Sequence, residues 1–364
     1  MRVYDGKDVR NVALAGHGHS GKTQLTAALL YTAGVTNRLT KVDEGNTLTD
    51  FDEEEVERKI TINTAIAALE WDNTKINLLD TPGFNIFMND THSSLHAADG
   101  ALIVVDAVSG VEIQTEKVWA FAEEFHEGHA IVINKLDRER ASFDRALESI
   151  HETFGKICVP IHLPIGEEKD FCGIVDLVSM KAYFYTPGGD GKGKEAPIPA
   201  AMQEAAKAAH DILVEAVASG KDELMEEFFE DGTLPEEHVI AGLHEELAAD
   251  TIVPILCASG SENIGMDRLL DFCVRFMPSA IERKTHALRT AEGEIERPIS
   301  DSEPVSVFVF KTSVDPFQGR LSYFKVLSGV LKTDAHLINA RSQGDERFSH
   351  IGVPLGKNIQ PVTE

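Results

Sequence analysis

Residues 11–25 read Asn-Val-Ala-Leu-Ala-Gly-His-Gly-His-Ser-Gly-Lys-Thr-Gln-Leu, and this segment carries the clearest structural signal in the chain. The apolar run at 12–15 predicts a buried strand, and apolar residues at helical spacing begin at Leu25. The glycines between them permit backbone conformations in which successive N–H groups surround an anion at the start of a helix. The pattern Gly-x-x-x-x-Gly-Lys-Thr over 16–23, with a strand before it and a helix after it, therefore predicts a phosphate-binding loop.

Each residue of this phosphate loop is a candidate ligand contact. The Lys22 ammonium adds a positive charge for the β- and γ-phosphates, and the Thr23 hydroxyl can bind Mg²⁺. The alternative is a glycine-rich turn followed by a chance Lys-Thr pair, which the flanking strand and helix disfavour. The candidate residues are Gly16, His17, Gly18, His19, Ser20, Gly21, Lys22 and Thr23.

The composition excludes several classes of protein. Asp and Glu number 60 and Lys and Arg 34, and the net charge of −26 argues against a surface that wraps DNA through counterion release. The four cysteines form no Cys-x-x-Cys pair, so we expect reduced thiols in the cytoplasm instead of a zinc site or a disulfide framework. The first residues lack a signal-peptide core and no apolar run approaches about 18 residues, so we expect no membrane segment.

Apolar runs that end in polar residues recur beyond the phosphate loop. Strands are expected at 76–80, 99–106, 130–137 and 252–256, and segments with helical spacing separate them. Such alternation is typical of a mostly parallel sheet with helices on both faces. The carboxyl ends of these strands should then lie beside the phosphate loop.

Polar residues at two of these strand ends predict the rest of a nucleotide site. Asp80, in Asp-Thr-Pro-Gly, can hold Mg²⁺ through water, and Gly83 can present its N–H to a γ-phosphate. In Asn-Lys-Leu-Asp at 134–137, the Asp137 carboxylate can accept from both N1–H and the exocyclic amine of guanine, which adenine cannot match. Each motif alone is weak, but the three in order, each after a buried strand, predict a GTP-binding domain.

Three longer stretches make the chain resemble the elongation factor G family of translational GTPases. They are Asp-Gly-Ala-Leu-Ile-Val-Val-Asp-Ala-Val-Ser-Gly-Val-Glu-Ile-Gln-Thr-Glu-Lys-Val-Trp at 99–119, Leu-Pro-Ile-Gly-Glu-Glu-Lys-Asp-Phe-Cys-Gly-Ile-Val-Asp-Leu at 163–177 and Asp-Pro-Phe-Gln-Gly at 315–319. The resemblance covers nearly the whole chain. It implies GTP or GDP with Mg²⁺ as ligands and the ribosome as partner. Full-length members continue beyond their second domain, so the chain is expected to be an N-terminal part that does not catalyse translocation by itself.

Changes of pattern along the chain suggest its division into domains. An acidic, weakly periodic stretch at 43–58 predicts a mobile loop, and amphipathic helices are expected at about 200–229 and 235–249. The expected fold is an α/β P-loop GTPase domain with an α+β insertion, followed by an all-β barrel that is incomplete. The expected boundaries are 1–157 and 252–280 for the GTP-binding domain, 158–251 for the insertion, 281–302 for a linker and 303–364 for the partial barrel.

The resemblance also implies roles for residues outside the phosphate loop. Glu-Arg-Lys-Ile-Thr at 57–61 matches the family's Arg-Gly-Ile-Thr, so Thr61 is the expected first-switch residue at Mg²⁺ and the γ-phosphate, although Lys59 replaces the usual glycine. Ser259 in Cys-Ala-Ser-Gly matches the fifth guanine-binding element, which from the residues alone would be a strand-to-helix turn. The implied Mg²⁺ ligands are Thr23, Thr61 and Asp80. The implied nucleotide contacts beyond the phosphate loop are Asp80, Gly83, Asn134, Lys135, Asp137, Ser259 and Gly260.

Two departures from the family pattern fall on the hydrolytic residues. The family has a histidine after Asp-Thr-Pro-Gly that positions the attacking water, whereas this chain has Phe84, which can neither donate nor accept a proton. The family's aspartate in the phosphate loop is His19 here. With Thr61, these two positions are the candidate catalytic residues. The hypothesis is that GTP binds normally and that its hydrolysis is slow or needs a group from the partner. The alternative is that Phe84 only packs under the switch and that another residue or the substrate assists.

The predicted function is a GTPase switch of the elongation factor G type, with a low intrinsic rate of GTP hydrolysis. It is expected to be a cytoplasmic monomer that binds guanine nucleotide and the ribosome, but neither DNA nor membrane. Two alternatives stay open. One is a ribosome-associated GTP-binding module with little or no catalysis, and the other is a related translational GTPase such as a release-factor recycler or a ribosomal protection protein of the tetracycline-resistance type.

Overall fold

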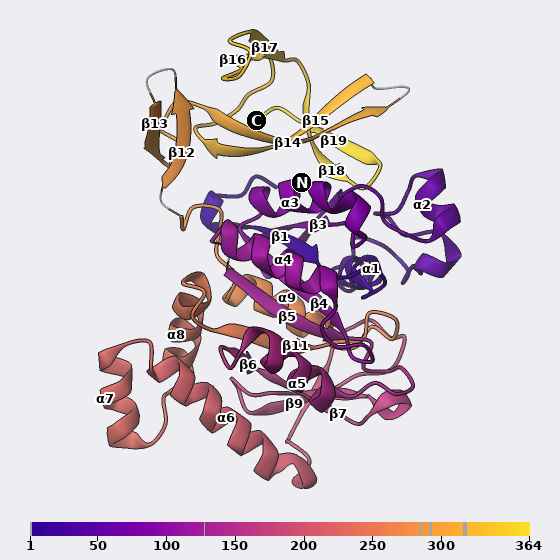
Figure 1. Cartoon of the computed structure of the whole chain (residues 1–364), viewed down its shortest axis with the longest axis vertical. Coiled ribbons are helices and arrows are strands. Elements are labelled where there is room, and N and C mark those ends of the chain that lie inside the picture. Colours follow the sequence, from indigo (N-terminus) through magenta and orange to yellow (C-terminus); the bar gives the residue numbers. More distant parts are fainter. Residues whose placement is uncertain (1, 127, 284, 291–292, 316–318) are drawn as a thin grey trace.

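Three parts of the molecule are stacked along its long axis, as Figure 1 shows: a β-rich part, a sheet covered by helices, and a part dominated by helices α6 to α8. The computed structural model describes residues 2–126, 128–283, 285–290, 293–315 and 319–364. Every helix within these ranges is too short or too polar to span a bilayer.

A nine-stranded sheet forms the middle part, in the order β19-β18-β2-β3-β1-β4-β5-β11-β6. Six neighbouring strands run parallel: β3 (Thr74–Asp80), β1 (Val9–Ala15), β4 (Gly100–Asp106), β5 (Gly128–Asn134), β11 (Val253–Cys257) and β6 (Cys158–Pro160). β2 (Ala65–Trp71) is antiparallel to β3. Because β1 lies between β3 and β4, the phosphate loop begins beside the carboxyl ends of both strands.

Helices cover both faces of this sheet. α1 (Lys22–Thr32) and α9 (Met266–Arg275) share one core, and α3 (Met88–Ala97), α4 (Ile113–Glu124) and α5 (Phe143–Phe154) share the other. The side chains of β1 alternate between them: Val12 and Leu14 belong to the first core, and Ala13 and Ala15 belong to the second. A strand buried on both sides explains the continuous apolar run in the sequence. The predicted α/β class with a mostly parallel sheet is confirmed.

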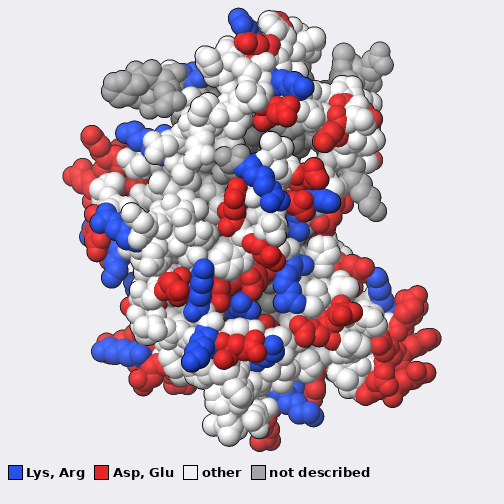
Figure 2. Space-filling view, turned by 180° about the vertical axis from the view of Figure 1, so that it is seen from behind, with Lys and Arg blue, Asp and Glu red and all other residues white. Residues whose placement is uncertain are grey.

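The segment between β6 and β11 forms a small sheet and a group of helices. The sheet contains β10 (Lys194–Ala196), β9 (Lys181–Phe184), β8 (Gly173–Asp176) and β7 (His162–Ile165), all antiparallel. The helices are α6 (Gln203–Ala218), α7 (Asp222–Asp231) and α8 (Glu236–Ala248). Figure 2 shows acidic side chains gathered at this end of the molecule.

Two expectations for this segment are wrong in detail. Cys158–Pro160, assigned from sequence to the insertion, is β6 of the main sheet and pairs in parallel with β11. The helical stretch expected at about 200–229 is divided, because the chain leaves the helix around Gly220 and Lys221 has an extended backbone before α7. A three-residue strand and a short break are both smaller than the windows over which periodicity is measured.

The acidic stretch at 43–58, expected as a mobile loop, contains two short helical turns. They are η2 (Val42–Glu44) and α2 (Glu53–Arg58). A capping box fixes the start of α2: Asp52 accepts from the backbone of Glu55, and the Glu55 side chain accepts from the backbone N–H of Asp52. A six-residue helix that buries only Glu55 leaves no apolar periodicity in the sequence, which explains why it was missed.

The remaining chain is built from antiparallel hairpins. β12 (Thr285–Thr290) pairs with β13 (Gly293–Pro298) within the expected linker at 281–302, so much of that segment is a hairpin instead of an irregular linker. The side chains of this hairpin whose burial is described are exposed or half-buried, and the sequence shows no apolar alternation that would have indicated the hairpin. β14 (Ser306–Asp315) pairs with β15 (Gly319–Ser328), β16 (Ala335–Ile338) with β17 (Asp345–Phe348), and β18 (Ile351–Leu355) with β19 (Asn358–Val362). The centre of the motif at 315–319 lies outside the described residues.

The last hairpin ties the β-rich part to the main sheet. Leu355 of β18 pairs with Ala67 of β2, and the backbone N–H of Gly356 donates to the Ile66 carbonyl at 2.9 Å. β18 and β19 thus add two strands at the edge formed by β2. The β-rich character predicted for 303–364 is confirmed, whereas its boundary and the other domain boundaries that no contact corrects stay predictions.

Candidate functional site

The phosphate loop, between β1 and α1, is fixed by close backbone approach to β5. Gly21 precedes α1 with a φ of 94°, in the left-handed region that favours glycine. A Cβ at this position would meet Asn134 Nδ2 at 2.6 Å. The glycine is therefore required both by the turn into the helix and by the neighbouring amide.

Lys22 points its ammonium into the phosphate loop. Its Nζ donates to the carbonyls of Gly16 at 3.1 Å and His17 at 2.9 Å. Burial lowers its pKa to about 8, against the opposing effect of the Asp80 and Asp50 carboxylates. A buried cation beside the N-terminus of α1 is suited to an anionic ligand such as phosphate.

Hydroxyl and carboxyl groups from three segments meet beside the start of α1. The Oγ1 atoms of Thr23 and Thr61 are 2.8 Å apart, and Thr61 donates to Asp50 Oδ1 at 2.9 Å. Thr49 donates to Asp80 Oδ2 at 2.7 Å. Burial raises the pKa of Asp50 to about 7 and that of Asp80 to about 6. We call these five residues the hydroxyl–carboxyl cluster.

The hydroxyl–carboxyl cluster fits a magnesium ion. Asp50 Oδ2 and Asp80 Oδ1 are buried and have no hydrogen-bond partner among the described residues. Unpaired buried carboxylate oxygens are costly, and Mg²⁺ prefers oxygen ligands, often through water. Within the described ranges, no group of three or more His, Cys, Asp or Glu side chains could hold a metal ion. Magnesium would therefore depend on the threonine hydroxyls and on oxygens of its ligand.

The cluster contains the three predicted metal ligands, but the sequence analysis missed Thr49 and Asp50. Asp50 lies among many other acidic residues, and nothing local distinguishes it from them. Glu55 was also missed: it is buried, and its Oε1 accepts from the backbone N–H groups of Ile62 and Asn63, each at 3.0 Å. This anchor holds the backbone immediately after Thr61.

Lys59 adopts the conformation that a glycine would favour. It caps α2 with φ 56° and ψ 40°, in the left-handed region. Its exposed ammonium lies 3.5 Å from Asp43 Oδ1. The turn before Thr61 therefore keeps its left-handed shape despite the lysine, at a cost of about 1 kcal/mol.

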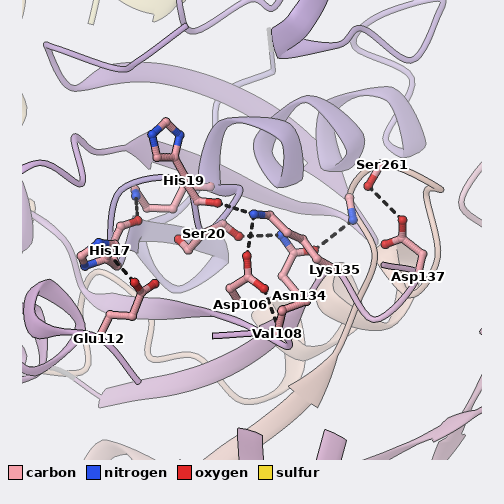
Figure 3. Close-up of polar contacts among 12 residues, drawn as sticks. His17, His19, Ser20, Asp106, Val108, Glu112, Asn134, Lys135, Asp137 and Ser261 are labelled. Carbon is pink, nitrogen blue, oxygen red and sulfur yellow. Dashed lines mark hydrogen bonds and ion pairs between the residues drawn. The ribbon is translucent and has the colours of Figure 1, made fainter. Parts of the chain in front are cut away.

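Side chains after β5 bind back to the phosphate loop, as Figure 3 shows. Asn134 Nδ2 donates to the Ser20 carbonyl at 3.0 Å, and its Oδ1 accepts from the N–H of Gly260 at 3.1 Å. Lys135 Nζ forms an ion pair with Asp106 Oδ2 at 2.7 Å and donates to the His19 carbonyl. These contacts hold the phosphate loop against the ends of β4 and β5. The sequence predicts Asp106 as the end of a strand, but no local pattern indicates its ion pair with Lys135.

The loop after β11 holds the Asp137 carboxylate. The buried Ser259 hydroxyl donates to Asp137 Oδ1 at 2.6 Å, and the Ser261 hydroxyl lies 3.5 Å from Oδ2. The second of these contacts is drawn in Figure 3. Asp137 is half-buried, so its carboxylate is fixed in place yet remains accessible to a ligand.

The two residues that depart from the family pattern contact each other. The rings of His19 and Phe84 are 5.1 Å apart at 88°, an edge-to-face pair. The Phe84 ring also covers Gly18, where an added Cβ would lie 3.0–3.2 Å from three ring atoms. His17, in contrast, turns to α4: its Nε2 is 3.5 Å from Glu112 and its Nδ1 is 3.4 Å from the N–H of Gln114.

The helix that follows Phe84 packs against the β-rich part. Lys311 of β14 donates to the Thr64 carbonyl at 2.6 Å and lies 3.6 Å from Asp90 of α3. The ring of His96, also on α3, is 4.5 Å from that of Phe308 on β14. The segment after Thr61 and helix α3 are thus both in contact with β14.

Comparisons with known proteins agree with this geometry. The sequence model described as the elongation factor Tu GTP-binding domain matches residues 7–279, and the one described as elongation factor G domain 2 matches residues 304–364. The chain is 36% identical to elongation factor G of Mycoplasma pneumoniae over 364 residues, which is all of this chain and 53% of that protein. A crystal structure of a Thermus thermophilus protein superimposes with a TM-score of 0.86 at 32% identity, covering 98% of this chain and 51% of that one. The chain spans about half the length of these relatives, and it belongs to the elongation factor G family of translational GTPases.

Proposed function

We propose that this chain binds GTP with Mg²⁺ and acts as a conformational switch on the ribosome, in translocation or a related step. The observation that supports this best is the hydroxyl–carboxyl cluster. Thr23 belongs to the phosphate loop, Thr61 follows α2, and Asp80 ends β3, so one ion and one phosphate group can connect three separate segments. The strongly negative composition and the surface acidity give no basis for a DNA partner, and we propose a cytoplasmic monomer.

Each part of the site has a role in this proposal. The N–H groups of the phosphate loop and the Lys22 ammonium bind the phosphates, and the N–H of Gly83 meets the γ-phosphate. Thr23 and Thr61 would hold Mg²⁺, with the Asp50 and Asp80 carboxylates as further oxygen acceptors beside it, and the ion would neutralise phosphate charge. The fixed Asp137 carboxylate selects guanine.

Loss of the γ-phosphate would release the segments that follow Thr61 and Gly83. Because Lys311 contacts both Thr64 and Asp90, this release would reach the β-rich part directly. The switch would thus convert a change of one phosphate group into a change at β14.

Hydrolysis is the step that Phe84 affects most. Its ring covers Gly18 but offers no lone pair or proton to an attacking water. We therefore propose a low intrinsic rate of GTP hydrolysis, and a ribosome-associated GTP-binding module with little catalysis is the second candidate function. The length of the match to elongation factor G favours that family over release-factor recyclers and ribosomal protection proteins.

Single-turnover hydrolysis of pre-bound GTP tests this proposal in the full-length protein, with and without ribosomes. The Phe84→His variant is expected to hydrolyse GTP on the order of 10–10²-fold faster with unchanged GTP affinity, because it restores an imidazole beside Gly18. Phe84→Leu is the matched control that keeps the position apolar. Fast ribosome-stimulated turnover by the parent, with no gain in the histidine variant, would contradict impaired hydrolysis. Absence of GTP binding would contradict the whole proposal.

A further inference from the structure

His19 belongs to the phosphate loop and occupies the position at which the family has an aspartate. Its side chain is exposed and makes an edge-to-face contact with Phe84. In the ranges that the structure describes, neither ring nitrogen has a hydrogen-bond partner, and Figure 3 shows the ring turned away from the contacts of Asp106 and Lys135. Among these same residues, the polar contact of His19 is through its carbonyl, which accepts from Lys135.

The other titratable groups around the phosphate loop are already engaged. Lys22 is bound to loop carbonyls, His17 faces Glu112 and the N–H of Gln114, and Lys135 is paired with Asp106. The carboxylates of the hydroxyl–carboxyl cluster face the threonine hydroxyls. The carboxylate oxygens of this cluster that lack a hydrogen-bond partner are buried. His19 is instead an exposed group of the phosphate loop whose ring nitrogens, among the described residues, have no partner and can accept from a water molecule.

The position of the His19 ring is defined from two sides. Its backbone is in the left-handed region, with a φ of 64°, and Lys135 holds its carbonyl. Histidine adopts this region more readily than most residues other than glycine, so the loop holds the ring in this direction at little cost. The Phe84 ring covers Gly18 and meets the His19 imidazole edge-to-face. This contact limits the rotation of the imidazole.

We propose that His19 is a catalytic residue of GTP hydrolysis in this chain, and that Phe84 is the positioning residue that holds its ring. The inference rests on the proposed function, because it concerns the same GTP. A water molecule, whose O–H donates to the neutral imidazole, attacks the γ-phosphorus. A new P–O bond forms, the bond from γ-phosphorus to the bridging oxygen breaks, and its electron pair stays on the β-phosphate of GDP. The proton of the water ends on the released phosphate.

The test is single-turnover hydrolysis by full-length parent and His19→Gly protein on ribosomes, with GTP and GDP affinities measured separately. Glycine keeps the left-handed backbone, so the variant removes the ring without disturbing the loop. Hydrolysis is expected to fall about 10²-fold while both affinities change less than about threefold.

Two further measurements separate a chemical from a structural role. Added imidazole should restore part of the lost rate in His19→Gly, and Phe84→His in the same background should restore it without added imidazole. An unchanged rate in His19→Gly, or an equal loss of affinity and rate, would overturn the inference. A parent that binds GTP but never hydrolyses it on ribosomes would also overturn it while leaving nucleotide binding intact. A parent that binds no GTP would overturn the proposed function first and this inference with it.

Discussion

The proposed base-binding half of the site, around Asn134, Lys135, Asp137 and Ser259, differs from the proposed hydrolytic half, around His19, Thr61 and Phe84, in the contacts that hold it together. In the base-binding half, the polar groups have partners within the protein. The Asn134 amide both donates and accepts a hydrogen bond, and Lys135 forms an ion pair with Asp106. In the hydrolytic half, two buried carboxylate oxygens have no partner among the described residues, and Phe84 offers only ring contacts. The contacts within the protein therefore preorganise the first half, whereas in the proposed function the second half is completed by GTP and Mg²⁺.

The largest expected effect is a loss of stability when the ion pair that supports the base-binding half is removed. The side chains of Lys135 and Asp106 are both about nine-tenths buried. Asp106→Ala therefore leaves a buried ammonium with no carboxylate to pair with it. The variant should lose about 3–5 kcal/mol of the free energy of unfolding, measured in urea. Asp43→Ala, which breaks an exposed pair with Lys59, should change stability by less than about 0.5 kcal/mol. Equal effects of the two variants would show that the buried pair is no stronger than the exposed one.

The next effect concerns nucleotide choice. Asp137→Asn should weaken GTP binding by about 10²-fold, because the amide cannot accept from both guanine donors. Binding of xanthosine triphosphate, which carries a carbonyl in place of the exocyclic amine, should improve. Equilibrium titration with labelled nucleotides measures both effects. Phe84→Leu belongs to the other half and should leave both affinities unchanged, so a similar loss in that variant would remove the distinction between the halves.

A buried histidine makes the support of the base-binding half sensitive to pH. His162 lies under β11, with its Nδ1 3.5 Å from the N–H of Cys257, and burial lowers its pKa to about 4. In the unfolded chain its pKa is about 6.5, so the unfolded state takes up the proton first as the pH falls. Stability should therefore decrease by on the order of 1–3 kcal/mol between about pH 6.5 and about pH 4.

The His162 effect is checked by urea unfolding of the parent and of His162→Gln across that pH range. The glutamine variant should lose less stability than the parent on acidification, because the titrating group is gone. His336→Gln is the control, since His336 is exposed in the β-rich part. If His162→Gln kept the parent's full pH dependence, other groups would be responsible.

The smallest expected effect is a gain of stability from a substitution in the hydrolytic half. Lys59→Gly should stabilise the protein by about 0.5–1 kcal/mol, because glycine adopts the left-handed turn after α2 without strain. Arg58→Gly, one position earlier in the helix, should instead destabilise by about 1 kcal/mol. Thermal unfolding of the two variants provides the comparison. A loss of stability in Lys59→Gly would show that the Lys59 side chain contributes more than its backbone costs.

The sequence predicted the elements of this site better than its contacts. Glycine spacing and buried strands indicated the phosphate loop and the strand ends, because these depend on local backbone geometry. Asp50 and Glu55 were missed because their partners, Thr61 and the backbone after it, are defined only once α2 forms. His19 and Phe84 are far apart in the sequence, so each was interpreted as an independent departure from the family pattern. Only the structure shows that their rings are in contact.

The pairing of Leu355 with Ala67 has a consequence for the solubility of shortened forms of this protein. β2 would be the edge of the main sheet if β18 and β19 were removed, and its unpaired backbone groups could then pair with another chain. The apolar side chains of β2, including the buried Leu69, would make such pairing more damaging. The hairpin at 351–362 therefore covers part of this edge, so a fragment ending near residue 303 should aggregate more readily than the chain that retains it.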